Sequence, residues 1–309
     1  MKNLSLLFIL IVTMISCSKQ GQINNEYQSL NLINSDLISD RPQNINSVVT
    51  IVKLNEAPLF EQLKNGAIDD ELKKRILAEQ QNALESFKKI SKEIKLLYSY
   101  KFVINGMALI TPAKYLSDIA LLPEVKSITK ETKFERPLFT SVKNANKEFN
   151  GVTSVNFIKA KRVHTELNVL GQGMKVGIID TGIDYTHAMF GGEGTEEAYK
   201  NIDPNTTNDI YPSQKVVGGI DLVGSLYSPG AMNFDHRIPK PDLNPIDESG
   251  HGSHVAGSVA GKGDNKNTYD GVAPAAKLFA IKVFGKKGGT GEAVVVAALE
   301  YAADPNGDL

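Results

Sequence analysis

Two short segments carry an aspartate and a histidine that could form part of a hydrolytic triad. Asp180 follows the apolar run Val176–Ile179, and His251 opens the small-residue segment His251–Gly257. A buried carboxylate can accept the Nδ1 proton of an imidazole and fix its tautomer. The imidazole can then move a proton between a nucleophile and a leaving group. We therefore predict Asp180 and His251 as catalytic residues of a hydrolase.

The third member of such a triad, a nucleophilic serine, has no candidate in this sequence. Asp, His and Ser can follow one another in that order along a chain. Here the last serine is Ser258, which lies one turn further along the predicted helix of His251. The sequence therefore contains the orienting acid and the base, and the nucleophilic Ser is absent from this chain.

Both Asp180 and His251 also have alternative interpretations. Asp180 alone could merely end a strand or cap a helix. His251 and His254 could bind zinc together, as the two histidines of His-Glu-x-x-His peptidases do. The spacing is one residue shorter, however, no Glu follows His251, and no third ligand is evident. We expect His251 to be catalytic, His254 to be a structural neighbour, and no metal to bind there.

The segments around the two residues alternate between expected strands and helices. Asp180 would lie at the carboxyl end of a buried strand, where α/β folds place reactive groups. Gly182 would let the chain turn away sharply. Thr290 is the expected N-cap of the last helix. The alternation predicts an α/β fold with a doubly wound parallel sheet. The expected strands are 174–179 and 276–284, and the expected helices are 157–164, 251–260 and 291–303.

A smaller unit precedes this pattern. An apolar stripe with helical spacing predicts one long helix, and β-branched runs predict strands on either side of it. The order of the elements predicts a compact α+β sandwich. The expected elements are a strand at 48–54, a helix at 70–98, a strand at 100–110 broken at Asn105–Gly106, a short helix at 112–121 and a strand at 125–129.

The larger unit resembles the subtilisin-like serine peptidases. Asp180-Thr181-Gly182 matches the aspartate motif of that family, and His251–Gly257 matches its histidine motif with Ser253 in place of the usual Thr. Gly271–Pro274, followed by the strand Lys277–Val283, also fits. The resemblance implies a subtilisin-like sheet, of which this chain holds the N-terminal part, and a serine-type endopeptidase acting on proteins or peptides.

The smaller unit resembles the inhibitor-type propeptide of the same family. The similarity lies in the strand Val48–Leu54, the segment Asn105–Ala108 and the segment Leu122–Ile128. In that family the propeptide templates folding and lays its C-terminal tail across the active cleft. The tail here would be about Glu131–Asn150, with a cleavage within it. The resemblance thus implies a secreted zymogen.

Family features expected after the last helix do not occur before Leu309. They are a substrate-lining strand ending in Ser-x-Gly, the oxyanion Asn and the Gly-Thr-Ser-Met-Ala nucleophile motif. Because a sheet ending here would be left open, we expect a sequence truncated before the catalytic serine. The fragment lacks the nucleophile, so we expect it to be inactive. The alternative is a non-catalytic, propeptide-like inhibitor or chaperone of a separate peptidase. The DNA downstream of Leu309 would separate the two.

The N-terminus predicts export. Lys2 precedes the apolar run Leu4–Ile15, which is shorter than the roughly 18–20 residues of a membrane span and suits a secretory signal. Cys17 at its end resembles the lipidated residue of a bacterial lipoprotein, although an ordinary cleaved signal remains an alternative. We expect the cell envelope or the secreted fraction, with membrane contact only through a lipid on Cys17.

Composition narrows the partners further. A net charge of −1 argues against a nucleic-acid partner, and the single cysteine allows no internal disulfide. We expect a monomer with no cofactor. The loop Asp203–Asp209 has oxygen ligands that suit calcium, but such loops are more often plain turns. The predicted domains are a signal peptide at 1–17, a flexible tether at 18–45, a propeptide domain at 46–135, a linker at 136–154 and an incomplete catalytic domain at 155–309.

Overall fold

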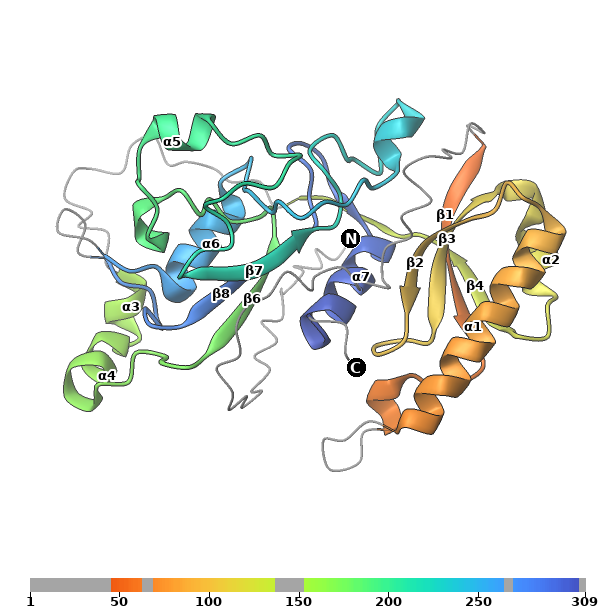
Figure 1. Cartoon of the computed structure of the whole chain (residues 1–309), viewed down its shortest axis with the longest axis horizontal. Helices are drawn as coiled ribbons and strands as arrows, with labels where there is room; N and C mark the ends of the chain where they lie inside the picture. Colours follow the sequence, from red (N-terminus) through yellow and green to blue (C-terminus); the bar gives the residue numbers. More distant parts are fainter. Residues whose placement is uncertain (1–45, 63–68, 137–152, 264–268, 306–309) are drawn as a thin grey trace, which may run out of the picture.

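A computed structural model of the chain describes residues 46–62, 69–136, 153–263 and 269–305 (Figure 1). The predicted signal peptide with Cys17, the tether and most of the predicted linker lie outside the described residues. Within the described ranges, no helix has the length and apolar character that crossing a bilayer requires.

The first unit is a four-stranded antiparallel sheet in the order β2-β3-β1-β4. Alternate residues of its strands face opposite sides. Met107 and Leu109 pack with Phe87 of α1, whereas Ala108 and Ile110 belong to a second apolar cluster on the other face. The elements are β1 (Ser47–Leu54), α1 (Asp70–Ile90), β2 (Lys95–Tyr100), β3 (Gly106–Pro112), α2 (Leu116–Ala120) and β4 (Val125–Lys130).

The long helix α1 ends earlier than its sequence pattern predicts. Asp69 caps its start by accepting hydrogen bonds from two backbone N–H groups, and its buried stripe ends at Phe87. Ser91 then adopts an extended backbone, with φ −163° and ψ 139°. The predicted helix at 70–98 is therefore wrong beyond Ile90. Leu97 is buried from a strand, so its position prolongs the apolar spacing of the helix by coincidence.

The predicted strand at 100–110 is two strands. β2 ends at Tyr100 and β3 begins at Gly106, and the two pair in antiparallel fashion. Asn105 in the turn is buried and accepts a hydrogen bond from the side chain of Gln80. The predicted break at Asn105–Gly106 is thus the end of a hairpin connection.

The second unit is built on a three-stranded parallel sheet in the order β6-β8-β7, which confirms the predicted α/β class. Helix α6 packs on one face, where Ala256 meets Leu278 and Ala280. Helix α7 covers the other face, where Ala297 meets Ile281. The elements are β6 (Lys175–Asp180), β7 (Val216–Asp221), α6 (His251–Ala260), β8 (Lys277–Lys282) and α7 (Glu292–Ala303). Strand β7 was not among the predicted elements.

Three local expectations in this unit are wrong. The predicted helix at 157–164 is two helices, α3 (Thr153–Phe157) and α4 (Ala160–Leu167), because Lys159 adopts a left-handed backbone with φ 61°. The strand expected at 174–179 is not buried throughout, since Lys175 is exposed and the residues after it are alternately buried and half-buried. Helix α7 has Gly291 as N-cap, without a side-chain cap, because Thr290 is paired in β9 (Thr290–Gly291).

The two units share a core around α7, which lies between their sheets (Figure 1). The hydroxyl of Tyr98 donates to the carbonyl of Leu222 at 2.8 Å, and that of Tyr100 to the carbonyl of Ala293 at 2.7 Å. Strand β5 (Lys133–Phe134) pairs in antiparallel fashion with β9.

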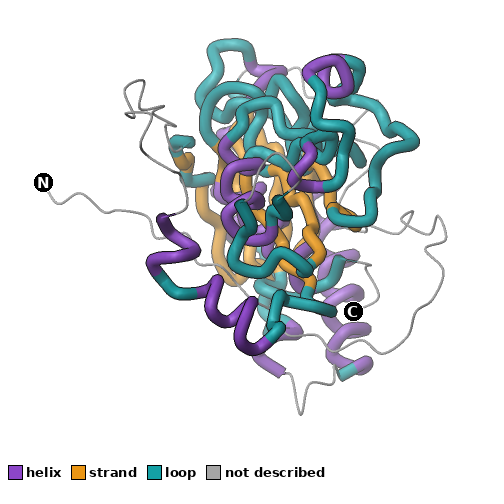
Figure 2. The backbone as a smooth tube through the Cα atoms, turned by 90° about the vertical axis from the view of Figure 1, so that its left-hand side faces the viewer, coloured by secondary structure: helices purple, strands orange, loops and turns teal. Residues whose placement is uncertain are grey.

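Loops surround the strands, and many of them lie at one end of the molecule (Figure 2). Several short helices lie within these connections. They are α5 (Glu196–Lys200) and short 3-10 helices at Leu59–Gln62, Ala113–Tyr115, Ala188–Phe190 and Phe234–Arg237.

Candidate active site

The structure brings Asp180 and His251 into direct contact. Nδ1 of His251 lies 2.7 Å from Oδ1 and 2.8 Å from Oδ2 of Asp180. The carboxylate is buried, and 22% of the imidazole side chain is exposed. When Nδ1 carries the proton, the ring donates to the carboxylate, which fixes the tautomer. The arrangement leaves a partly exposed imidazole held by a buried acid.

Two glycines let the aspartate and histidine segments approach each other. Gly182 turns the chain after β6 with φ +106°, and a Cβ there would lie 2.4 Å from the carbonyl oxygen of Pro245. A Cβ on Gly252 would lie 2.1 Å from the carbonyl oxygen of Gly182. Because real Cβ atoms do not come so close to backbone oxygens, larger residues would force the segments apart.

Thr181 connects the strand of Asp180 to the helix of His251. Its backbone N–H donates to Oδ1 of Asp180 at 2.7 Å. Its hydroxyl accepts from the N–H of Gly252 at 2.8 Å and donates to Oδ1 of Asp247 at 2.8 Å. The residue after the acid is therefore bonded to the residue after the base.

Asp247 binds the start of α6 through both carboxylate oxygens. Oδ1 accepts from the N–H groups of Ser249 and Gly250 at 2.8 and 2.9 Å. Oδ2 accepts from the N–H and the hydroxyl of Ser253 at 2.9 and 2.7 Å. Asp247 thus supplies the capping that Gly250, the N-cap residue, cannot. Sequence reasoning missed this residue, although an Asp shortly before a helix is a known capping pattern.

The structure also places His254, the second histidine of the motif. His254 is exposed on α6, and its carbonyl oxygen accepts from the hydroxyl of Ser258 at 3.0 Å. Across the described ranges, no group of three or more His, Cys, Asp or Glu side chains is arranged to hold a metal.

The oxygens of the Asp203–Asp209 loop are hydrogen-bonded by protein groups. One carboxylate oxygen of Asp203 accepts from the backbone and the side chain of Asn205 at 3.0 and 3.2 Å. These hydrogen bonds lower the pKa of Asp203. The side chain of Asn244 donates to the carbonyl oxygens of Asp203 and Thr206. Several oxygens that a calcium ion would use are therefore already hydrogen-bonded, either within the loop or by Asn244.

Together these features define a protein of two joined units. One is an α/β domain with the carboxylate–imidazole pair found in triad hydrolases, and the other is an antiparallel α+β unit docked on α7. Residues 171–308 match the subtilase family, and residues 51–136 match the peptidase inhibitor I9 family. The chain therefore carries a domain of the subtilase family preceded by an inhibitor I9 domain.

Curated relatives agree with this assignment. The chain is 30% identical over 249 residues to "Subtilisin-like protease SBT2.2" of Arabidopsis thaliana, covering 74% of this chain and 26% of the relative. It is 28% identical to "Bacillopeptidase F" of Bacillus subtilis (strain 168), covering 68% and 13%. It is 27% identical to "Minor extracellular protease Vpr" of the same organism, covering 84% and 28%. The chain thus spans between 13% and 28% of the length of these relatives.

A solved structure shows a similar fold. The epidermin leader peptide processing serine protease of Staphylococcus aureus matches with a TM-score of 0.51 and 17% identity, over 84% of this chain and 48% of that chain. At this identity the match is to the fold alone.

Proposed function

We propose that the protein is a serine-type endopeptidase in which His251 is the general base and Asp180 orients it. The contact between Nδ1 of His251 and both oxygens of Asp180, at 2.7 and 2.8 Å, carries this proposal. Membership of the subtilase family supports it. The substrates are proteins or peptides.

In the proposed reaction His251 removes the proton of a serine hydroxyl as its oxygen attacks a peptide carbonyl. The imidazolium then gives that proton to the leaving amine, and Asp180 stabilises the positive ring. Water hydrolyses the acyl-enzyme in the reverse sequence of proton transfers. No cofactor is needed. The 309 residues contain no serine after Ser258, so we expect them to be inactive alone.

We further propose that the I9 unit makes this protein a zymogen. Its last described strand, β5, pairs with β9. Beyond β5, Nη1 of Arg136 contacts Oγ of Ser249 at 2.8 Å and the carbonyl of Lys286 at 3.1 Å. The chain thus runs from the docked sheet to the loop that precedes His251, which suits a tail that covers the active site until it is cut. Export, with a lipid on Cys17, completes the proposal.

The test is a peptidase assay on the product of the complete reading frame that contains these residues. We expect casein hydrolysis, a fall of roughly 10 000-fold in kcat for Asp180→Asn, and a similar or larger fall for His251→Ala. We expect no turnover by the 309-residue chain. Activity of the complete product that survives His251→Ala would contradict the proposal, as would turnover by the short chain that His251→Ala abolishes.

The docked I9 unit also favours a second candidate, a non-catalytic inhibitor or chaperone of a separate peptidase. In that case the complete product hydrolyses nothing, and the chain inhibits a subtilase added in trans. The same preparation distinguishes the two functions.

A further inference from the structure

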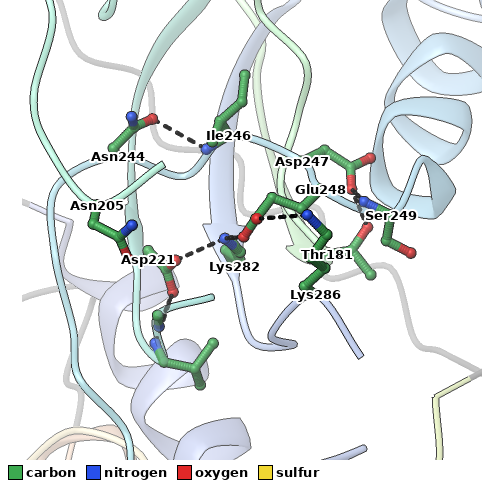
Figure 3. A network of polar contacts seen from close by, with 12 residues as sticks. Thr181, Asn205, Asp221, Asn244, Ile246, Asp247, Glu248, Ser249, Lys282 and Lys286 are labelled. Atoms are coloured by element: carbon green, nitrogen blue, oxygen red, sulfur yellow. Dashed lines mark hydrogen bonds and ion pairs between the residues drawn. The ribbon is translucent and has the colours of Figure 1, made fainter. Parts of the chain in front are cut away.

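A lysine is fully buried at the edge of the parallel sheet where Asp180 lies. Lys282 ends the central strand β8, in register with Asp180 on β6 and with Asp221 on β7. Its side chain is 0% exposed, and Nζ lies 2.8 Å from Oδ2 of Asp221 and 3.1 Å from Oε2 of Glu248 (Figure 3). A cation at this depth is costly unless acids surround it.

The acids around Lys282 outnumber it. Burial alone would lower the pKa of Lys282, but the carboxylates of Asp221 and Glu248 outweigh burial and raise it. Asp242 forms a backbone bridge with Asp221, and burial, followed by the charge of Asp221, raises the pKa of Asp242 to about 7. Lys286 reaches Glu248 from the surface at 3.8 Å. The buried lysine is therefore charged and is the centre of the cluster.

Asp221 fixes one side of the lysine to the sheet. Its other carboxylate oxygen, Oδ1, accepts from the N–H groups of Val223 and Gly224, both at 2.8 Å. Asp221 is therefore held at the end of its own strand. Lys282, ion-paired with Asp221, therefore has a fixed position relative to the end of the strand that carries Asp180.

Glu248 links Lys282 to the loop that precedes His251. It lies in the loop three residues before His251 and directly after Asp247. Asp247 ties the same loop to Thr181, and Glu248 ties it to Lys282 (Figure 3). The loop is thus attached at two neighbouring strand ends, to Thr181, which directly follows β6, and to Lys282, the last residue of β8.

We propose that Lys282 and Glu248 are positioning residues that hold the loop of His251 so that its Nδ1 stays directed at Asp180. The catalytic meaning of this pair rests on the proposed peptidase function, but the positioning itself does not. If the contact between Lys282 and Glu248 only stabilised the fold, its removal would leave the tautomer of His251 unchanged. If the contact positions the loop, its removal frees the imidazole to turn away from Asp180.

The experiment is histidine ¹⁵N NMR on the whole 309-residue chain, which reports the tautomer of each ring. His251→Gln assigns the resonance. In the wild type we expect the Nδ1–H tautomer. In Glu248→Ala we expect the ratio of Nδ1–H to Nε2–H to fall by about tenfold, as for the loss of one modest hydrogen bond. In Glu248→Gln, which keeps an acceptor for Lys282, we expect a fall of about threefold.

The matched control is Glu196→Ala, which removes an exposed glutamate that pairs with Lys200 on α5 at 2.7 Å, and which should leave the ratio unchanged. Circular dichroism checks that each variant is folded. If Glu248→Ala does not fold, Glu248→Gln decides. A wild-type ratio in the folded Glu248 variants would overturn the proposal, as would a wild-type ring lacking the Nδ1–H tautomer. Because no nucleophile is involved, failure of the peptidase assay leaves this result independent.

Discussion

The closest approach between the two motif segments is set by Gly252, which packs against the carbonyl oxygen of Gly182. Its N–H also donates to the hydroxyl of Thr181. A methyl group at Gly252 cannot be accommodated by a side-chain movement, because the atom it meets belongs to the backbone. The pairing of Asp180 with His251 therefore depends on this missing side chain.

We predict that Gly252→Ala lowers the free energy of unfolding by about 2–3 kcal/mol and weakens the Asp180–His251 contact. Urea unfolding followed by circular dichroism measures the first effect, and the tautomer ratio of His251 measures the second. Gly230→Ala is the control, because a Cβ there meets nothing within 4 Å. Equal stability of the two variants would show that the loop yields without cost.

The sequence was sufficient to find Asp180 and His251 because each lies in a short, recognisable segment. It did not reveal the residues that hold them. Thr181 and Asp247 are 66 positions apart, and Lys282 and Glu248 are 34 apart, so no local spacing relates them. Lysine and glutamate are also usually solvated, and only the fold shows that Lys282 is buried.

At the scale of elements, burial was predicted better than conformation. The stripe of α1 continues at Leu97, which is indeed buried, but from β2. Periodicity records which residues face a core and cannot tell where a helix gives way to a strand. The parallel strands β6 and β8 were recognisable from their apolar runs, whereas β7 contains two glycines, Gly218 and Gly219, that interrupt such a run.

The turn between β2 and β3 is held by an acid from another unit. Glu300 of α7 accepts from the backbone N–H groups of four consecutive residues, within 3.4 Å. These residues are Lys101, Phe102, Val103 and Ile104. The I9 hairpin therefore depends on a side chain almost 200 residues away in the sequence.

We predict that Glu300→Ala lowers the free energy of unfolding by roughly 3 kcal/mol, because four N–H groups lose a charged acceptor. Glu300→Gln keeps one acceptor oxygen and should cost less. Urea unfolding gives both values, and hydrogen exchange at 101–104 should accelerate in the order wild type, Gln, Ala. Unchanged exchange in Glu300→Ala would show that water replaces the carboxylate without loss.

At the scale of the whole molecule, the two units share one core. Tyr98 and Tyr100 of β2, Ile220 of β7 and Tyr301 of α7 belong to a single apolar cluster. Stability of the I9 unit and of the subtilase unit should therefore be coupled. Both the relative positions of the units and this shared core were beyond what sequence patterns could give, because they depend on which faces meet.

Glu131 makes that coupling sensitive to pH. Glu131 directly follows β4, and its side chain contacts the first turn of α7, where Oε1 accepts from the N–H of Ala293 at 3.3 Å. Burial raises the pKa of Glu131 to about 7, against the smaller opposing effect of this hydrogen bond. In the unfolded chain the carboxyl ionises near its usual pKa of about 4.3. The folded chain therefore holds a proton that the unfolded chain releases between these two values.

It follows that the wild type loses stability as the pH rises from about 4.3 to about 7, by at most about 4 kcal/mol, with no further loss above that range. Glu131→Gln cannot ionise. We predict that it matches the wild type near pH 4 and exceeds it in free energy of unfolding at pH 8. Urea unfolding followed by circular dichroism tests this, since the chain has no Trp. Glu135→Gln, an exposed acid of the same segment, should show no such difference. A Glu131→Gln variant no more stable than the wild type at pH 8 would mean that Glu131 ionises freely in the docked state. The I9 unit would then be held by the Glu300 and tyrosine contacts, and Glu131 would make no pH-dependent contribution to the free energy of unfolding.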